Sequence, residues 1–299
     1  MHAPLALRQV LRMVSRSSSA TVELVAVRRP EVVLRRTAYA GVVAEERVLS
    51  RAFPFVTHSS RLQALTLLEG KLRFCRTPER APLTLEPGDS VLLSPPEIAR
   101  TRMEDVVFVD VEWALDGPER SLAPKRLPRL DVGRARALGE RLAADESPGR
   151  AHFAEAFSLF AGAGVKFGGL DAEGLRGGPS ERDQRIAHAI GAQVADLRRG
   201  ATELAMGELT ELSPRQLQRV LAEFCQRYQI SATSWRDLRN RYRVQFGIAL
   251  LSVPELSVAA IAGDVGYGSA AAFARALANL GLPPPGELRE EIARLAQVE

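Results

Sequence analysis

The chain has 299 residues, of which 46% are hydrophobic and 25% charged, and its net charge is +4. This composition excludes wholesale disorder, and the length suits two domains. The two cysteines, Cys75 and Cys225, are far apart, which excludes a disulfide framework and a zinc site of cysteine pairs. The chain begins with arginines inside its apolar run, unlike a signal peptide, and no apolar run reaches the roughly 20 residues of a membrane span. We therefore expect a cytoplasmic protein with no membrane partner.

Residues 21–113 have the pattern of short β-strands. The segment TVELVAV alternates, LQALTLLEGKLRF is two short runs around a Glu-Gly turn, and LEPGDSVLL places a Pro-Gly-Asp turn before a strand. Frequent short strands with turn signals predict a sandwich or a small barrel.

Three side chains on or beside these strands could line a ligand pocket: His58, Arg73 and Trp113. Arg73 alternates with Leu72 and Phe74, and the sequence leaves open whether its face is lumen or solvent. An inward arginine would need a carboxylate, from Asp110, from Glu112 or from a ligand. In the inward case we expect a small organic acid as effector.

A proline-rich connector at 116–130 leads to two predicted helices at 131–164. Their apolar residues recur at helical spacing: Leu138, Leu142, Phe153, Phe157 and Phe160. This stripe is expected either to join two copies in a homodimer or to pack against the barrel. The glycine-rich stretch 167–183 then predicts a boundary between domains at 1–178 and 179–299.

Beyond this boundary the chain is predicted to be helical, and LSPRQLQR at 212–219 is its most informative segment. Ser213 and Pro214 predict a helix start. One face carries the buried-type stripe Leu217, Val220, Leu221 and Phe224, and another carries Arg215, Gln218 and Arg219, with Gln216 at its border. Arginine and glutamine can bond guanine and adenine in the DNA major groove, although an ordinary amphipathic surface helix is the simpler alternative.

The same layout occurs twice. ELAMGELTELSPRQLQRVL and AAIAGDVGYGSAAAFARAL each predict a short helix, a turn and a second helix that begins at Ser213 or Ser269. A helix of about 17 residues lies between them. Two helix-turn-helix units joined by one long helix are typical of a DNA-binding domain.

Residues 183–291 resemble the AraC/XylS family of transcription regulators. The resemblance is carried by LSPRQLQRVL, TSWRDLRNRYR, LSVAAIAGDVGYGSAAAFARAL and PGELR. It implies an α+β chain: a cupin-like barrel with trailing helices for effector binding or dimerisation, then an all-α DNA-binding domain. LLEGKLRF and LEPGDSVLLSPP look like the cupin module. The resemblance further implies an effector-responsive activator that works with RNA polymerase.

Two departures from the family pattern bear on the site. FCQRYQISA at 224–232 lengthens the first unit, so either its second helix extends or a loop bulges. In the second unit alanines fill most of the helix, and only Ser269, Arg275 and Asn279 offer polar contacts. Seven arginines lie between Ser213 and Arg243, whereas Arg275 is the one basic residue from 245 to 279.

We therefore expect the first unit to read bases and the second to dock on the backbone. Arg275 could instead brace the fold. The residues expected to contact DNA are Ser213, Arg215, Gln216, Gln218, Arg219, Arg239, Arg243, Tyr267, Ser269 and Arg275.

An enzyme is not expected. His58 is the one histidine in the strand region, so no metal site, cofactor or catalytic cluster is predicted, and neither a nucleophile elbow nor a phosphate loop occurs. The alternative function is a cupin module that binds a small molecule or a protein and carries a degenerate, non-regulatory helix-turn-helix domain.

Overall fold

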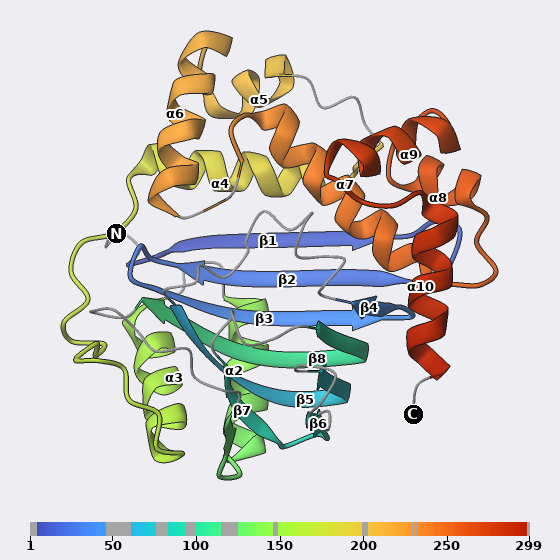
Figure 1. The fold of residues 1–299 in the computed structure, drawn as a ribbon. Helices are drawn as coiled ribbons and strands as arrows, with labels where there is room; N and C mark the ends of the chain where they lie inside the picture. The colour runs from blue at the N-terminus through green and yellow to red at the C-terminus, as the bar shows by residue number, and fades with distance from the viewer. Residues whose placement is uncertain are drawn as a thin grey trace.

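The computed structural model describes residues 5–45, 61–75, 83–93, 100–114, 125–145, 149–198, 203–228, 230 and 232–297. The chain is α+β, with an antiparallel sheet first and helices after it (Figure 1). The predicted ligand residue His58 lies outside the described residues.

The strands are β1 (Leu7–Val14), β2 (Thr21–Arg28), β3 (Val32–Ala40), β4 (Val43–Glu45), β5 (Arg61–Cys75), β6 (Leu83–Leu85), β7 (Ser90–Leu93), β8 (Arg100–Ala114) and β9 (Lys125–Leu127). They form one sheet in the order β1-β2-β3-β8-β5-β7-β9, with β4 on β8 and β6 on β5. Among the described strands, β1 and β9 end the path. The closed cupin barrel that the resemblance implies is therefore not confirmed.

Two strands differ from the sequence-based expectation. Strand β1 was not predicted, because Gln9 interrupts its inward row of Leu7, Leu11 and Met13. Strand β5 is continuous, whereas a turn was predicted at Gly70. The register against β8 shifts between Leu67 and Lys71, so the Glu-Gly pair makes an irregularity within a strand.

One face of the sheet is covered by α2 (Val132–Ala144) and α3 (Arg150–Gly162), the two helices predicted at 131–164. The five stripe residues Leu138, Leu142, Phe153, Phe157 and Phe160 are at most 7% exposed within one chain. Of the two alternatives for this stripe, packing within one chain accounts for the burial of these side chains. Trp113 belongs to the same core, with its ring centroid 4.7 Å from that of Phe167.

The structure does not bring Arg73 and Trp113 together, as one shared ligand pocket would require. Trp113 is paired with Leu62 and Arg73 with Arg102, toward opposite ends of the long β5–β8 ladder. Eleven residues of strand separate the two positions along β5, which corresponds to roughly 35 Å.

Asp110 and Glu112, the two carboxylates considered as partners of Arg73, are bonded to another arginine. Buried Arg35 on β3 donates to Asp110 over 2.6 Å and to Glu112 over 2.7 Å, and Gln63 donates to Asp110 over 3.0 Å. Burial alone would lower the pKa of the Arg35 guanidinium, but the two carboxylates raise it. This buried ionic cluster is a structural element of the sheet.

On the other face, one apolar core runs from the sheet into the C-terminal helices. Helix α4 (Glu181–Val194) lies along edge strand β1 (Figure 1). A Cβ on Gly191 would lie 2.9 Å from the Val10 carbonyl oxygen, so glycine permits this approach. Covering β1 in this way protects an edge that could otherwise pair with another chain.

The remaining helices are α5 (Glu203–Thr210), α6 (Pro214–Arg227), α7 (Trp235–Leu251), α8 (Val258–Asp264), α9 (Ala270–Asn279) and α10 (Pro285–Gln297). The predicted start at Ser213 is confirmed, since its side chain caps α6. Helix α6 runs on to Arg227, so part of the additional sequence extends the helix.

Candidate nucleic-acid interface

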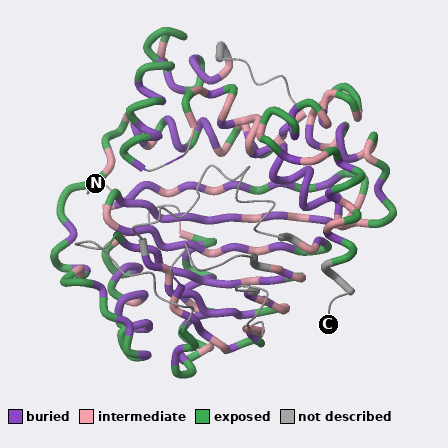
Figure 2. Tube along the Cα trace, in the orientation of Figure 1, coloured by how far each residue is buried: buried purple, intermediate pink, exposed green. Residues whose placement is uncertain are grey.

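Helix α6 presents one buried and one exposed face. Leu217, Val220, Leu221 and Phe224 are at most 3% exposed and anchor it in the core. Arg215, Gln216, Gln218 and Arg219 are exposed. Exposed residues follow the outer side of this helix in Figure 2. The helix spacing therefore separates packing residues from polar residues as predicted.

The exposed side chains of α6 differ in how far they are already engaged. The Gln216 Oε1 accepts from the Ser213 backbone N–H over 3.1 Å and from its hydroxyl over 2.7 Å, which closes a capping box. Arg219 has an ion pair of 4.0 Å with Glu223. Within the described residues, Arg215 and Gln218 make neither a side-chain hydrogen bond nor an ion pair. Arg215, Gln218 and Arg219 are thus the side chains most available to a ligand.

The C-terminal end of α6 is fixed to α4. Asp183 is 1% exposed and accepts from Arg227 over 2.6 Å and from the Tyr228 hydroxyl over 3.3 Å. Burial, together with Asp183, raises the pKa of Tyr228 to about 12. The exposed face of α6 is therefore held rigidly on the body of the protein.

Two half-buried arginines of α7 that were predicted to contact DNA form hydrogen bonds within the protein. The Leu197 carbonyl accepts from Arg239 over 3.2 Å and from two nitrogens of Arg243 over 3.0 and 2.6 Å. Burial and the neighbouring Arg243 lower the pKa of Arg239 to about 10, and burial lowers the pKa of Arg243. Both residues brace α7 against the segment that follows α4.

Tyr267 belongs to the same brace. Its hydroxyl donates to Asn240 over 2.6 Å, and the Arg243 guanidinium lies 5.4 Å from its ring centroid. Gly266 has a φ of +81°, and a Cβ there would lie 2.2 Å from the Leu197 oxygen. Only glycine fits this turn between α8 and α9 without displacement.

Helix α9 offers little polar surface. Ser269 caps it by accepting from the Ala272 N–H over 3.1 Å, and Phe273 and Leu277 are fully buried. Its exposed residues include Ala271, Arg275, Ala278 and Asn279. Arg275 is therefore outward-facing, which leaves a DNA contact open and gives no support to the bracing alternative.

Sequence reasoning missed the contact that holds α8. Asp264, its last residue, accepts from the Ser15 hydroxyl (2.6 Å), the Arg16 N–H (3.2 Å), and the Ser17 N–H and hydroxyl (3.2 and 3.0 Å). An acidic residue at a helix C-terminus is unfavourable for that helix. Its presence is explained by these four donors from the β1–β2 turn. No local pattern links positions 248 residues apart.

Within the described ranges no helix is long and apolar enough to cross a membrane. The same part of the chain contains no group of three His, Cys, Asp or Glu residues placed to hold a metal ion. Cys225 is buried, and burial raises the pKa of its thiol to about 12, which keeps it protonated near neutral pH.

No protein-family model matches the chain, and no curated protein matches it by sequence. Among solved structures, ToxT from Vibrio cholerae is 12% identical over 86% of this chain and 98% of its own, with a TM-score of 0.34. The C-terminal domain of AraT, a response regulator from Geobacillus stearothermophilus, is 24% identical over 38% of this chain and 88% of its own, with a TM-score of 0.32. A DNA-binding transcriptional dual regulator from Escherichia coli K-12 is 22% identical over 38% of this chain and 99% of its own, with a TM-score of 0.30. At such scores and identities these similarities do not establish a shared fold.

Proposed function

We propose that the chain is a sequence-specific DNA-binding transcription regulator of the AraC/XylS type. Helices α5 and α6 would form one helix-turn-helix unit, α8 and α9 a second, and α7 the connection. The observation that carries the proposal is the exposed Arg215, Gln218 and Arg219 face on a helix anchored through its opposite face. Such a face matches the donor and acceptor pattern of base edges in the major groove.

The two units have different roles in this proposal. Arg215, Gln218 and Arg219 read bases, while Ser213 and Gln216 shape the helix start beside the phosphates. Arg275 and Ser269 meet the backbone from the second unit. We assign Arg239, Arg243 and Tyr267 to bracing the domain, because their side chains are turned to protein partners.

The sheet region with α2 and α3, residues 1–178, serves as the effector-binding domain, and residues 179–299 as the DNA-binding domain. We propose activation through RNA polymerase as the mode of action. A homodimer would need a surface other than the α2–α3 stripe, which is buried in one chain.

A gel-shift experiment tests the proposal. The full chain is incubated with the DNA upstream of its own gene and an excess of unrelated DNA. A shifted band that survives the competitor supports the proposal. If the competitor removes the band at every protein concentration that shifts the DNA alone, the binding is non-specific and the proposal fails.

One observation favours a second function, a small-molecule- or protein-binding module with a degenerate helical domain. Helix α9 is alanine-rich on its exposed side and has one basic residue there. The same gel-shift separates the two functions, since a degenerate domain would show no competitor-resistant band.

A further inference from the structure

The turns within the two helix pairs differ at one backbone position. Glu211, directly after α5, has a φ of +59°, and Gly266, after α8, has a φ of +81°. Among the described residues other than glycine, only Glu211 and Asp105 have a positive φ. The first pair therefore places a glutamate in a conformation for which the second pair uses glycine.

A shared hydrogen bond shows that the two positions correspond. In each turn, the backbone N–H of the next residue donates to a carbonyl five positions earlier. The bonds run from Leu212 to Gly207 over 3.0 Å and from Tyr267 to Ala262 over 2.7 Å. Helices that end in this way usually have glycine at the left-handed position. Glu211 thus departs from the residue that the motif favours.

Local forces disfavour a glutamate here. In the left-handed conformation its Cβ lies too close to the following carbonyl oxygen, a contact that glycine avoids. The position also follows the C-terminus of α5, where the helix dipole disfavours a carboxylate. The N-terminus of α6 favours one, but at an exposed position this gain is smaller than the conformational cost.

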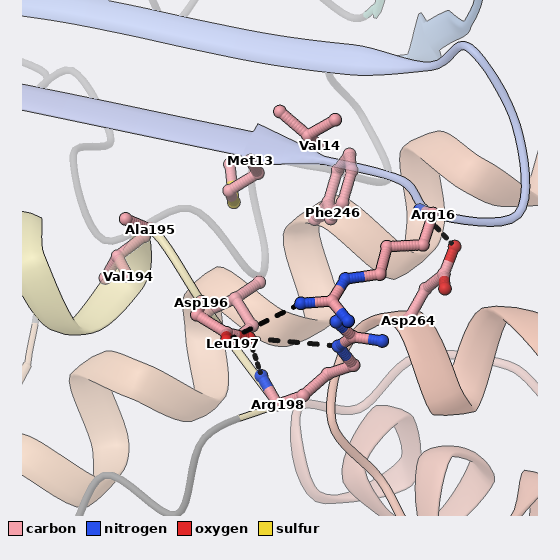
Figure 3. A pocket seen from close by; sticks show the side chains of 10 residues that line it. All are labelled: Met13, Val14, Arg16, Val194, Ala195, Asp196, Leu197, Arg198, Phe246 and Asp264. Carbon is pink, nitrogen blue, oxygen red and sulfur yellow. Dashed lines mark hydrogen bonds and ion pairs between the residues drawn. The ribbon is translucent and has the colours of Figure 1, made fainter.

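No contact within the described chain compensates for these costs. Glu211 is exposed, and within the described residues its side chain makes neither a hydrogen bond nor an ion pair. Asp264 at the end of α8 differs, because its carboxylate accepts from the β1–β2 turn, including the Arg16 N–H over 3.2 Å (Figure 3). The fold explains Asp264 but not Glu211, and an uncompensated left-handed residue indicates a role at a binding surface.

Glu211 lies beside the face of α6 that is proposed to read bases. It precedes Arg215 by four residues, so at most about 14 Å of backbone separates the two, or about four base-pair steps. The turn is held in place, since the neighbouring Thr210 is 1% exposed and its hydroxyl donates to the Met206 carbonyl over 2.7 Å. The carboxylate is therefore within reach of the same DNA segment.

Resting on the proposed function, we propose that Glu211 is a specificity-determining residue whose carboxylate accepts a hydrogen bond from a cytosine amino group. The cytosine lies within about four base pairs of the pair read by Arg215. In the major groove cytosine presents a donor, whereas guanine and thymine present acceptors, and adenine has an acceptor beside its amino group. Phosphates repel the carboxylate as well, so the contact requires α6 to be seated by Arg215 and Arg219.

Substitution of each base pair in the footprinted site tests the residue. For the parent, replacing this C·G pair should weaken binding about tenfold, and the penalty should disappear in Glu211→Gly. Glutamine can bond adenine through its amino group and N7, so Glu211→Gln should favour an A·T pair there. Affinity for unrelated DNA should rise about threefold in both variants, because a negative charge beside the phosphates is removed.

One control removes a charge and another tests the fold. Glu208 is also exposed and lies on α5 before the turn, so Glu208→Gln should keep the preference for cytosine. In denaturant unfolding, Glu211→Gly should raise the folding equilibrium constant about fivefold, because glycine relieves the left-handed conformation. A change of base preference in this variant would therefore not result from unfolding.

Failure of this inference and failure of the proposed function are distinguishable. If Glu211→Gly shows the same penalty as the parent at every base pair, whatever its affinity for unrelated DNA, the role of Glu211 is overturned and the regulator is retained. If the parent gives no competitor-resistant band, the regulator is rejected, and the role of Glu211 is rejected with it.

Discussion

The two helix pairs share a layout and differ in chemistry. In the first, α6 turns two arginines and a glutamine outward and is fixed by Asp183 on α4. In the second, α9 turns mainly alanines outward, and α8 is fixed to the sheet by Asp264. The difference teaches that the repeated layout reports the fold, whereas function follows from the side chains on the outer faces.

The difference extends to how each pair is supported. The turn between α8 and α9 depends on a left-handed glycine and on the Arg239, Arg243 and Tyr267 brace. The basic residues between 213 and 243 thus serve two purposes: Arg215 and Arg219 on α6 are exposed, whereas half-buried Arg239 and Arg243 on α7 donate to the Leu197 carbonyl. Counting arginines along the sequence could not separate these purposes.

The largest effect, on the stability of the protein, is expected in the second helix pair, α8 and α9. Gly266→Ala should lower the free energy of unfolding by about 2–4 kcal/mol, because a Cβ would meet the Leu197 oxygen in a left-handed conformation. Denaturant unfolding monitored by circular dichroism measures this. The control Gly263→Ala, where a Cβ meets nothing within 4 Å, should be neutral or stabilising. Equal stability of both variants would show that the brace contributes little.

The next effect concerns DNA. Arg215→Ala or Arg219→Ala should cost about 1–3 kcal/mol of specific binding, whereas Arg275→Ala should cost less than about 1 kcal/mol. Stability should hardly change, because the Arg219 ion pair with Glu223 is exposed. Arg136→Ala, a surface arginine on α2, is the control. Quantitative footprinting measures the affinity of each variant. A larger loss of specific affinity for Arg275→Ala than for the α6 variants would reverse the roles of the two helix pairs.

The smallest effect is expected at the contact between α8 and the sheet. Asp264→Asn should cost about 1 kcal/mol of stability, since weaker neutral hydrogen bonds replace charged ones at a partly exposed site. Hydrogen exchange should rise in the β1–β2 turn and in α8 but stay unchanged in α6. Faster hydrogen exchange in both helix pairs would contradict the view that each pair is anchored by its own contact. Glu255→Gln, at an exposed position, should alter neither.

Local chemistry made the helices predictable. Ser213 and Ser269 cap α6 and α9 as their position before the apolar repeat predicted. The outward face of α6 was predicted because a helix separates faces by spacing alone. These features depend on residues within four positions of each other.

Long-range pairing explains the failures. Arg35 on β3 lies 75 and 77 residues before its partners Asp110 and Glu112 on β8, and nothing in either sequence segment selects the partner. The burial of the phenylalanine stripe on α3 depended on which sheet face the helices cover. The bonding of Arg239 and Arg243 depended on the position of the Leu197 carbonyl, which no side-chain pattern reveals.

We propose that α6 reads bases and that α9 does not. The direct test measures the affinity of the full chain for its footprinted site after each base pair is substituted in turn. We predict penalties of about 1–3 kcal/mol per base pair confined to one of two segments about 34 Å apart, and their disappearance in the Arg215→Ala/Arg219→Ala double variant. Equal penalties in both segments, or penalties that persist in the double variant, would contradict the account.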